Sequence, residues 1–320
     1  MINAAVISTW GETPKYSPIE LPEPTPSQVR IKVLAAGLHT LVRSRAAGKH
    51  FSVANTSPPH VPGTDGVGTL IPSGELVYFN CLTAASGSFA DEINVEAADV
   101  FTLPLGADPD AVAVLGNPAM SSWMALVARA GVDPKQEQDF SVAIVGATGV
   151  SGQAAVQIAA AMGATRIVAI GRAGPKLDAT RELGATACIE LRQPLAATDF
   201  SAAADVDIVL DYLWGDVMLA ALSGIAAKRA IKTRRLTWVE IGALAGNEVA
   251  VSAALLRKAN ICLLGCGPGS WSYGELHAQI PAILAAIADG GMTTSFVVRG
   301  LSEVEDWWGE RGEARVLVKP

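Results

Sequence analysis

The segment that most constrains the fold is SVAIVGATGVSGQAAVQIAAAMGA, residues 141–164. An apolar strand-like run leads into glycines at 146, 149 and 152, and an alanine-rich helical run follows. Glycines at these positions allow a tight turn in which backbone N–H groups approach a pyrophosphate, whose charge the helix dipole stabilises. The order of strand, glycine loop and helix favours dinucleotide binding over glycines that serve only close packing.

Residues around this loop give the expected cofactor contacts. Val150 and Ser151 open the helix after Gly146 and Gly149, and the Ser151 hydroxyl adds a donor before Gly152. The next strand, RIVAIGR, ends in Gly171 and Arg172, about 20 residues past the loop, where an acidic residue would hold a ribose 2'-hydroxyl. The cations Arg172 and Lys176 suit a 2'-phosphate instead, so we expect NADP(H) rather than NAD(H) as the cofactor.

The pattern along the chain predicts two domains, one of them discontinuous. Up to about residue 120, short strand-like runs alternate with Pro and Gly clusters, which indicates a β domain. Strands and helices then alternate through DIVLDYL, DVMLAALSGIA, LTWVEIGAL and ICLLGC, as in a doubly wound α/β domain with a parallel sheet. We predict a β domain of residues 1–122 completed by 267–320, and a dinucleotide-binding domain of residues 123–266.

Composition narrows the class of partner. With 17% charged and 50% hydrophobic residues in 320, global disorder is excluded. Glycine, proline or charge interrupts each apolar run before the roughly 20 residues of a membrane span, and no signal peptide is apparent, so a cytoplasmic protein is expected. A net charge of -7 makes nucleic-acid binding unlikely and favours a small-molecule substrate. The basic run AAKRAIKTRRL is expected to be a solvated helix end, with a nucleic-acid patch as the alternative.

These motifs, in this order, resemble the medium-chain dehydrogenase/reductase superfamily, specifically its zinc-free quinone oxidoreductase-like branch. LPEPTPSQVRIKVLAAGLHT, VPGTDGVGTL, GSFADEINV, GATGVSG, VDIVLDYLWG and ARVLVKP carry the resemblance over almost the whole chain. It implies a GroES-like β domain, a Rossmann domain, an active cleft between them and a C-terminus that returns to the first domain. It also implies a homodimer through the last Rossmann strand, residues 261–266.

Departures from the zinc alcohol dehydrogenases of this superfamily suggest that no metal is bound. His39 stands where those enzymes place a cysteine ligand, and Thr64 and Asp65 stand where they place His and Glu. A catalytic zinc needs three protein ligands, and Thr64 does not complete such a set. The cysteine-rich lobe of those relatives is also missing, and the four cysteines here form no CxxC pair.

The resemblance also points to further site residues. His39 lies where zinc-free relatives carry a polar residue in the cleft, and it is our candidate for the catalytic proton donor, with a structural role as the alternative. Leu213, Ile241 and Gly242 follow Rossmann strands whose carboxyl ends face the cofactor. Asn117 is either a contact on the nicotinamide side or a helix cap.

Without a Lewis acid, hydride chemistry is easiest with acceptors already activated by conjugation. The sequence therefore predicts an NADPH-dependent reductase of quinones or enones. Reduction of simple aldehydes or ketones is the enzymatic alternative. A non-enzymatic nucleotide-sensing or RNA-binding protein on the same scaffold is the other alternative, because fold and function are separable.

Overall fold

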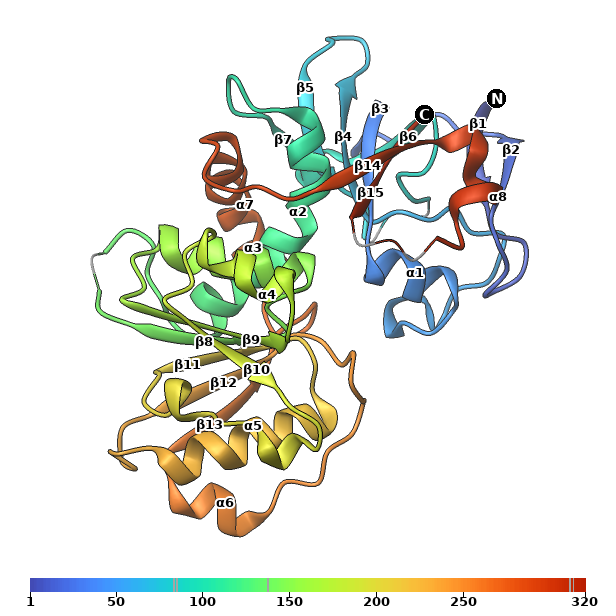
Figure 1. Cartoon of the computed structure of the whole chain (residues 1–320). Coiled ribbons are helices and arrows are strands. Elements are labelled where there is room, and N and C mark those ends of the chain that lie inside the picture. The colour runs from blue at the N-terminus through green and yellow to red at the C-terminus, as the bar shows by residue number, and fades with distance from the viewer. Residues whose placement is uncertain (83, 85, 137, 311, 313) are drawn as a thin grey trace. The chain divides into compact units, whose positions relative to one another are not determined.

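The structure is a computed structural model of the whole chain, and it describes residues 1–82, 84, 86–136, 138–310, 312 and 314–320. The chain forms two compact units (Figure 1). One consists of Met1–Asn117 and Ile280–Pro320, and the other of Pro118–Gln279. We call them the terminal unit and the central unit.

The unit boundaries differ from those that the sequence predicted, which were 122/123 and 266/267. Residues 267–279 pack on the central unit, where the Arg129 guanidinium donates to the Ser270 carbonyl at 2.7 Å. The Trp123 indole N–H likewise donates to Gln279 Oε1 at 3.0 Å. Such contacts assign residues 118–122 and 267–279, which lie outside the predicted 123–266, to the central unit.

The central unit is built on a parallel sheet. Its described residues form six strands in the order β10-β9-β8-β11-β12-β13, and every neighbouring pair is parallel. The strands are β8 (Ser141–Val145), β9 (Arg166–Arg172), β10 (Ala187–Leu191), β11 (Ile208–Asp211), β12 (Leu236–Glu240) and β13 (Ile261–Gly265). The strand order reverses between β8 and β11, so the topological switch point lies at their carboxyl ends. This confirms the predicted doubly wound sheet.

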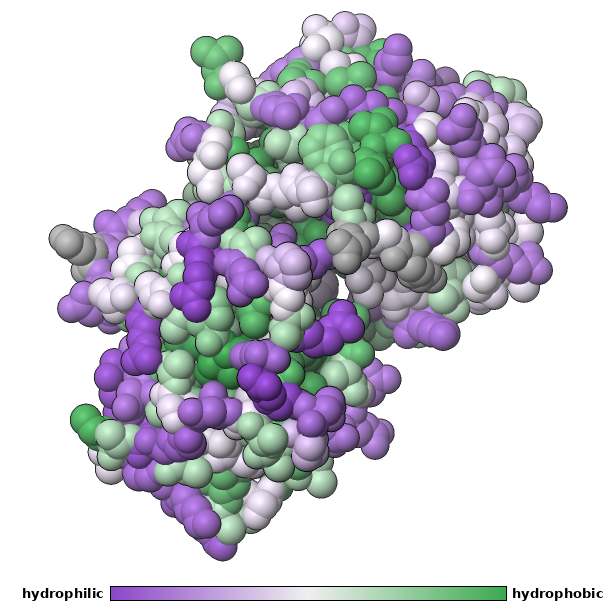
Figure 2. All heavy atoms as spheres, in the orientation of Figure 1, coloured by the Kyte–Doolittle hydropathy of each residue, from purple (hydrophilic) through white to green (hydrophobic). Residues whose placement is uncertain are grey.

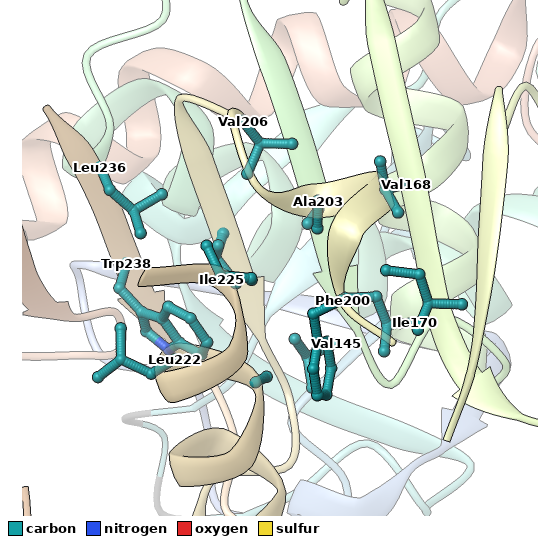
Figure 3. Close-up of a cluster of buried hydrophobic side chains, with 14 of the residues drawn as sticks. Val145, Val168, Ile170, Phe200, Ala203, Val206, Leu222, Ile225, Leu236 and Trp238 are labelled. Carbon is teal, nitrogen blue, oxygen red and sulfur yellow. The ribbon is translucent and has the colours of Figure 1, made fainter. Parts of the chain in front are cut away.

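A dense apolar core holds this sheet against helix α5 (Gly215–Lys228). Figure 3 shows side chains of β8, β9 and β12 gathered with Leu222 and Ile225 of α5. Trp238 is fully buried in this cluster. Burying each such side chain contributes about 1.5–3 kcal/mol to the stability of the fold. Because helices cover both faces of a parallel sheet, its strands are continuous apolar runs, and these runs predicted the strands.

The other helices of the central unit are α3 (Val150–Ala161), α4 (Pro175–Asp178) and α6 (Ala253–Lys258). The sequence predicted one helix over KLDATRELGA, residues 176–185. The structure has only the single turn of α4 and a 3-10 turn, η4 (Ala179–Arg181). Two further 3-10 turns, η5 (Leu195–Ala197) and η6 (Ser201–Ala203), precede β11.

Helix α2 (Pro109–Met124) leads from the terminal unit into the central unit and continues as a π-helical turn, η3 (Ala125–Arg129). It begins before the predicted helix SSWMALVARAG and passes through Gly116 and Pro118. The 21 residues Pro109–Arg129 are long and apolar enough to cross a membrane, although Gly116 and Pro118 interrupt the apolar run as expected. However, 72% of the apolar window is buried inside the protein, as in the core helix of a soluble protein.

The terminal unit is mainly antiparallel. Its described residues form the sheet β14-β15-β3-β4-β5-β7, with β6 paired to β3, and the separate pair β1-β2. The strands are β1 (Ile2–Val6), β2 (Lys15–Ile19), β3 (Gln28–Leu38), β4 (Asp65–Leu70), β5 (Leu76–Asn80), β6 (Glu92–Glu96), β7 (Val100–Thr102), β14 (Phe296–Gly300) and β15 (Arg315–Lys319). Pairing of β15 with β3 returns the C-terminus to the first segment, as predicted, whereas β14 was not predicted.

Short helices complete the terminal unit. They are α1 (Thr40–Ala46), α8 (Val304–Trp307) and the turns η1 (Phe51–Val53), η2 (Ala97–Asp99) and η7 (Leu301–Glu303), while α7 (Tyr273–Ala288) is shared with the central unit. Trp307 and Trp308 pack beside Phe89 in the apolar core of this unit. Hydrophilic residues are spread over the face of each unit in Figure 2.

Candidate functional site

The glycine loop lies where β8 ends and α3 begins, and the structure gives each glycine a separate role. Gly146 adopts φ +91°, a left-handed conformation that favours glycine. Its amide and that of Ala147 both donate to the Ile170 carbonyl, at 2.9 and 3.0 Å, which fixes the loop on β9. A Cβ atom on Gly152 would lie 2.3 Å from the Gly146 oxygen, so only glycine allows this packing of α3 on the loop.

Gly149 differs because it faces open space. It is the N-cap of α3, it is exposed, and a Cβ there would meet nothing nearer than the Gly146 oxygen at 3.6 Å. The first N–H groups of a helix lack intrahelical acceptors, and the helix dipole adds positive potential beside them. The loop therefore leaves space for an anionic group at the start of α3, beside Val150 and Ser151, which fits a dinucleotide pyrophosphate.

The end of β9 lies against the same loop. A Cβ atom on Gly171 would come within 2.7 Å of Thr148 Cγ2, so glycine permits this contact. Arg172, the last residue of β9, is exposed, and within the described part of the chain no hydrogen bond or ion pair holds its guanidinium. Lys176 follows in α4 and is half-buried. Both cations thus lie at the carboxyl edge of the sheet, on the β9 side of the switch point.

The predicted contacts after β11 and β12 lie on the other side of the switch point. Leu213 packs against the loop, since a Cβ on Gly146 would meet its side chain at 3.2 Å. Ile241 and Gly242 both donate backbone N–H groups to the Asp211 carbonyl, at 2.8 and 3.2 Å. The structure therefore gathers the predicted cofactor residues of the central unit along one edge of its sheet.

Sequence reasoning did not single out Asp211, the last residue of β11. Its fully buried carboxylate accepts bonds from the Leu213 and Trp214 amides at 2.9 and 3.0 Å and from the Trp238 indole at 3.1 Å. Burial nevertheless raises the pKa of Asp211. The carboxylate shapes the turn in which Trp214 adopts φ +56°, a costly conformation for a residue other than glycine. An acidic residue that ends an apolar strand was the available signal.

Asn117 is not a helix cap, because it lies inside α2, one residue before Pro118. The helix starts at Pro109 instead, so helix capping, the structural alternative for Asn117, does not apply. Asn117 is half-buried and is the last residue of the first segment of the terminal unit. Its role as a cofactor contact stays a prediction.

The terminal unit carries a separate buried polar cluster around His39, at the start of α1. The His39 Nε2 atom lies 3.2 Å from Asp65 Oδ1 and 3.1 Å from Thr64 Oγ1, and the Thr64 hydroxyl donates to Asp65 Oδ1 at 3.0 Å. The Tyr78 hydroxyl donates to the other Asp65 oxygen at 3.2 Å. A carboxylate oxygen only accepts, so these contacts assign the hydrogen of His39 to Nε2.

Charge in this cluster is balanced by Arg315, which the sequence did not point to. Arg315 is buried in β15 and donates to the Leu38 carbonyl at 3.3 Å. Burial lowers its pKa to about 10, against the opposing effect of Asp65. Burial also lowers the pKa of His39, which the Asp65 hydrogen bond only partly offsets. His39 is therefore neutral near pH 7, with Nδ1 left as an acceptor.

The cluster does not fit a catalytic zinc ion. Among the described residues, no group of three or more His, Cys, Asp or Glu side chains is placed to hold a metal. His39 and Asp65 are hydrogen-bonded to each other, and Thr64 lacks the donor chemistry of a zinc ligand.

The basic cluster at the end of α5 makes hydrogen bonds and ion pairs within the protein. Its residues are Lys228, Arg229, Lys232, Arg234 and Arg235. Arg229 donates to four backbone carbonyls, Lys232 to two, and Lys228 and Arg234 pair with Asp199 and Asp207. These contacts favour a structural role at the helix end over a nucleic-acid surface.

A parallel sheet with a glycine loop at its switch point, in a chain with a separate antiparallel unit, defines a two-unit dehydrogenase or reductase. No protein-family model matches the chain. The "Probable NADPH-dependent quinone reductase tdiC" of Emericella nidulans is 30% identical and is matched over the whole of both chains.

Solved structures agree with this class. A putative NADPH:quinone reductase from Mesorhizobium loti matches with a TM-score of 0.81 at 18% identity, over 100% of this chain and 98% of that one. A thermostable alcohol dehydrogenase from Pyrobaculum aerophilum matches with a TM-score of 0.77 at 25% identity, over 100% and 99%. The chain belongs to the medium-chain dehydrogenase/reductase superfamily, in its quinone oxidoreductase-like branch, and is an oxidoreductase.

Proposed function

We propose that this protein is an NADPH-dependent, zinc-independent oxidoreductase that reduces quinones or activated C=C bonds by hydride transfer. The observation that carries the proposal is the His39 cluster, in which Thr64 and Asp65 satisfy the histidine by hydrogen bonds instead of forming a metal-ligand set. The relative named as a probable NADPH-dependent quinone reductase supports the same reaction class.

NADP(H) fits the central unit through the chain's own groups. The amides at the start of α3 and the Ser151 hydroxyl would hold the pyrophosphate, in the space that Gly149 leaves open. Arg172, with Lys176, would pair with the 2'-phosphate by charge-assisted hydrogen bonds. Gly171, Leu213, Ile241 and Gly242 line the same sheet edge. When bound, the reduced nicotinamide supplies the hydride.

The terminal unit would supply polar contacts to the substrate. Asp65 holds the Nε2–H of His39, so Nδ1 is an acceptor that orients a water or hydroxyl from which the proton comes. A neutral imidazole is a weak source of that proton, which moves His39 from the predicted proton donor to an orienting group. With no metal to polarise an isolated carbonyl, a quinone or enone is the acceptor that this cluster suits.

Reduction of simple aldehydes or ketones is the second candidate, and the match to an alcohol dehydrogenase at 25% identity favours it.

The proposal also covers the assembly of the protein and its location in the cell. Among the described strands, β13 is one of the two edge strands of its sheet, and its free edge would pair in a homodimer through residues 261–266. We also place the protein in the cytoplasm, with no membrane or nucleic-acid partner.

The test is a substrate panel of quinones, enones, aldehydes and ketones, assayed by NADPH oxidation with and without a chelator. We expect turnover of quinones or enones at a rate that the chelator does not change. Turnover of aldehydes or ketones alone, at a rate that the chelator does not change, would favour the second candidate. Loss of activity on chelation, with recovery on adding zinc, would contradict the proposal.

A further inference from the structure

At the carboxyl edge of the central sheet, a buried chain of hydrogen bonds ends on helix α3 beside the glycine loop. The Ser122 hydroxyl of α2 lies 2.7 Å from the Tyr212 hydroxyl, and it reaches the carbonyls of Pro118 at 3.1 Å and Ser151 at 3.2 Å. Ser122 is fully buried and Tyr212 is buried. Because two carbonyls compete for the one hydroxyl hydrogen of Ser122, Tyr212 is the donor in their pair.

This chain joins three elements around the loop. Tyr212 directly follows β11, and its amide donates to the Val145 carbonyl, the last residue of β8, at 3.1 Å. A Cβ atom on Gly146 would meet the Tyr212 Cβ at 3.3 Å, so the tyrosine also packs against the loop. Ser151 lies in the first turn of α3. The hydroxyl chain therefore fixes that turn to α2 and to the end of β11.

We propose that Tyr212 and Ser122 are positioning residues for the dinucleotide site, acting through the Ser151 carbonyl on the first turn of α3. This inference rests on the proposed function, because it assumes that the turn binds a pyrophosphate. Binding to preorganised N–H donors needs them fixed in advance, since any ordering on binding weakens affinity. Neither residue touches the ligand in this account.

Cofactor selectivity distinguishes the role of Tyr212 and Ser122 from that of Arg172. Both nicotinamide dinucleotides carry the pyrophosphate, but only the phosphorylated form carries the 2'-phosphate. Loss of the hydroxyl chain should therefore weaken NADPH and NADH by the same factor and leave their ratio unchanged. Loss of Arg172 should change the ratio.

The experiment measures dissociation constants of NADPH and NADH by calorimetry for the wild type, Tyr212→Phe, Ser122→Ala and the double variant. Losing one buried hydrogen bond should weaken both cofactors by roughly 3- to 10-fold. Because Tyr212 acts through Ser122, adding Tyr212→Phe to Ser122→Ala should cause no further loss. Titrations are made well below the melting temperature of each variant, so a lower stability alone does not change the result.

Ser141→Ala is the matched control. Ser141 is a buried serine at the opposite end of β8, and its hydroxyl donates to Asp207 at 2.7 Å. It should lower the melting temperature without changing either dissociation constant. Wild-type affinity in Ser122→Ala, or equal weakening in Ser141→Ala, would overturn the inference alone. Failure of the wild type to bind either dinucleotide would overturn the proposed function and the inference together.

Discussion

The three loop glycines are equivalent in the sequence but not in the structure. A side chain on Gly152 would collide with the Gly146 backbone, so that position is required for packing. Gly149 has φ −80° and ψ 161°, which any residue adopts, and faces open space. Packing does not require glycine at 149, which is a favourable N-cap residue, and in the proposed function its missing side chain leaves room for the pyrophosphate to approach the backbone.

Replacing Gly149 tests this distinction. Gly149→Val should fold with a loss of only about 1 kcal/mol, the cost of valine at an N-cap, because a Cβ there meets no protein atom closer than 3.6 Å, but it should lose most affinity for NADPH. Gly152→Ala should instead lower the free energy of unfolding by about 1–3 kcal/mol through overpacking. Thermal melts and NADPH titrations measure both effects. Unimpaired NADPH binding by Gly149→Val would contradict a phosphate at this position.

At the level of residues, the sequence predicted the part of the site that is local. The glycines and Arg172 are recognisable because strand, loop and helix are consecutive. Asp65 was placed near His39 only through the family resemblance, and Tyr78 and Arg315 were missed, since pairing between β3, β4, β5 and β15 brings these residues together. Ser122 and Tyr212 are 90 residues apart, and nothing local marks either of them.

At the level of elements, the sequence located the parallel strands well and two helices poorly. Buried parallel strands are continuous apolar runs, which few other elements imitate. Helix α2 passes through Gly116 and Pro118, which normally end helices, because burial of its apolar residues outweighs the local cost of about 3 kcal/mol for an interior proline. The helix predicted after β9 shortens to one α-helical turn and a 3-10 turn, although its composition suits a helix.

The connection from α5 to β12 shows why charge runs are poor guides to function. Arg229 is buried and donates to the carbonyls of Ala204, Val206, Arg234 and Arg235 at 2.7–3.2 Å. Its guanidinium thus holds the loop before β12 against the segment before β11. A basic run read as a surface in fact contains a structural residue of the central unit.

Arg229→Ala should lower the free energy of unfolding by about 2–4 kcal/mol, because four carbonyls, two of them in buried hydrogen bonds, lose a charged donor. Arg229→Lys should recover only part of this, since an ammonium lacks the planar fork. Arg235→Ala is the control: Arg235 is exposed, and its guanidinium contacts the Cys262 sulfur at 3.3 Å. Denaturant unfolding measures all three. Equal, small effects of Arg229→Ala and Arg235→Ala would contradict this role.

At the scale of the whole molecule, the alternation of patterns correctly predicted a terminal unit built from both ends of the chain and a central unit with a parallel sheet. The boundaries were displaced because helices α2 and α7 each continue past the point where the composition changes. The proposed class of reaction rests on both units: on the glycine loop of the central unit, and on the hydrogen-bonded His39 of the terminal unit, around which the described residues form no metal-ligand set.

The most direct test of this account is a titration of the wild type and Arg172→Ala with NADPH and with NADH. The wild type should bind NADPH more tightly than NADH. Arg172→Ala should weaken NADPH by roughly 10- to 100-fold, through loss of a charge-assisted contact, while NADH changes by less than about twofold. Equal losses for the two cofactors, or a wild type without preference for NADPH, would contradict it.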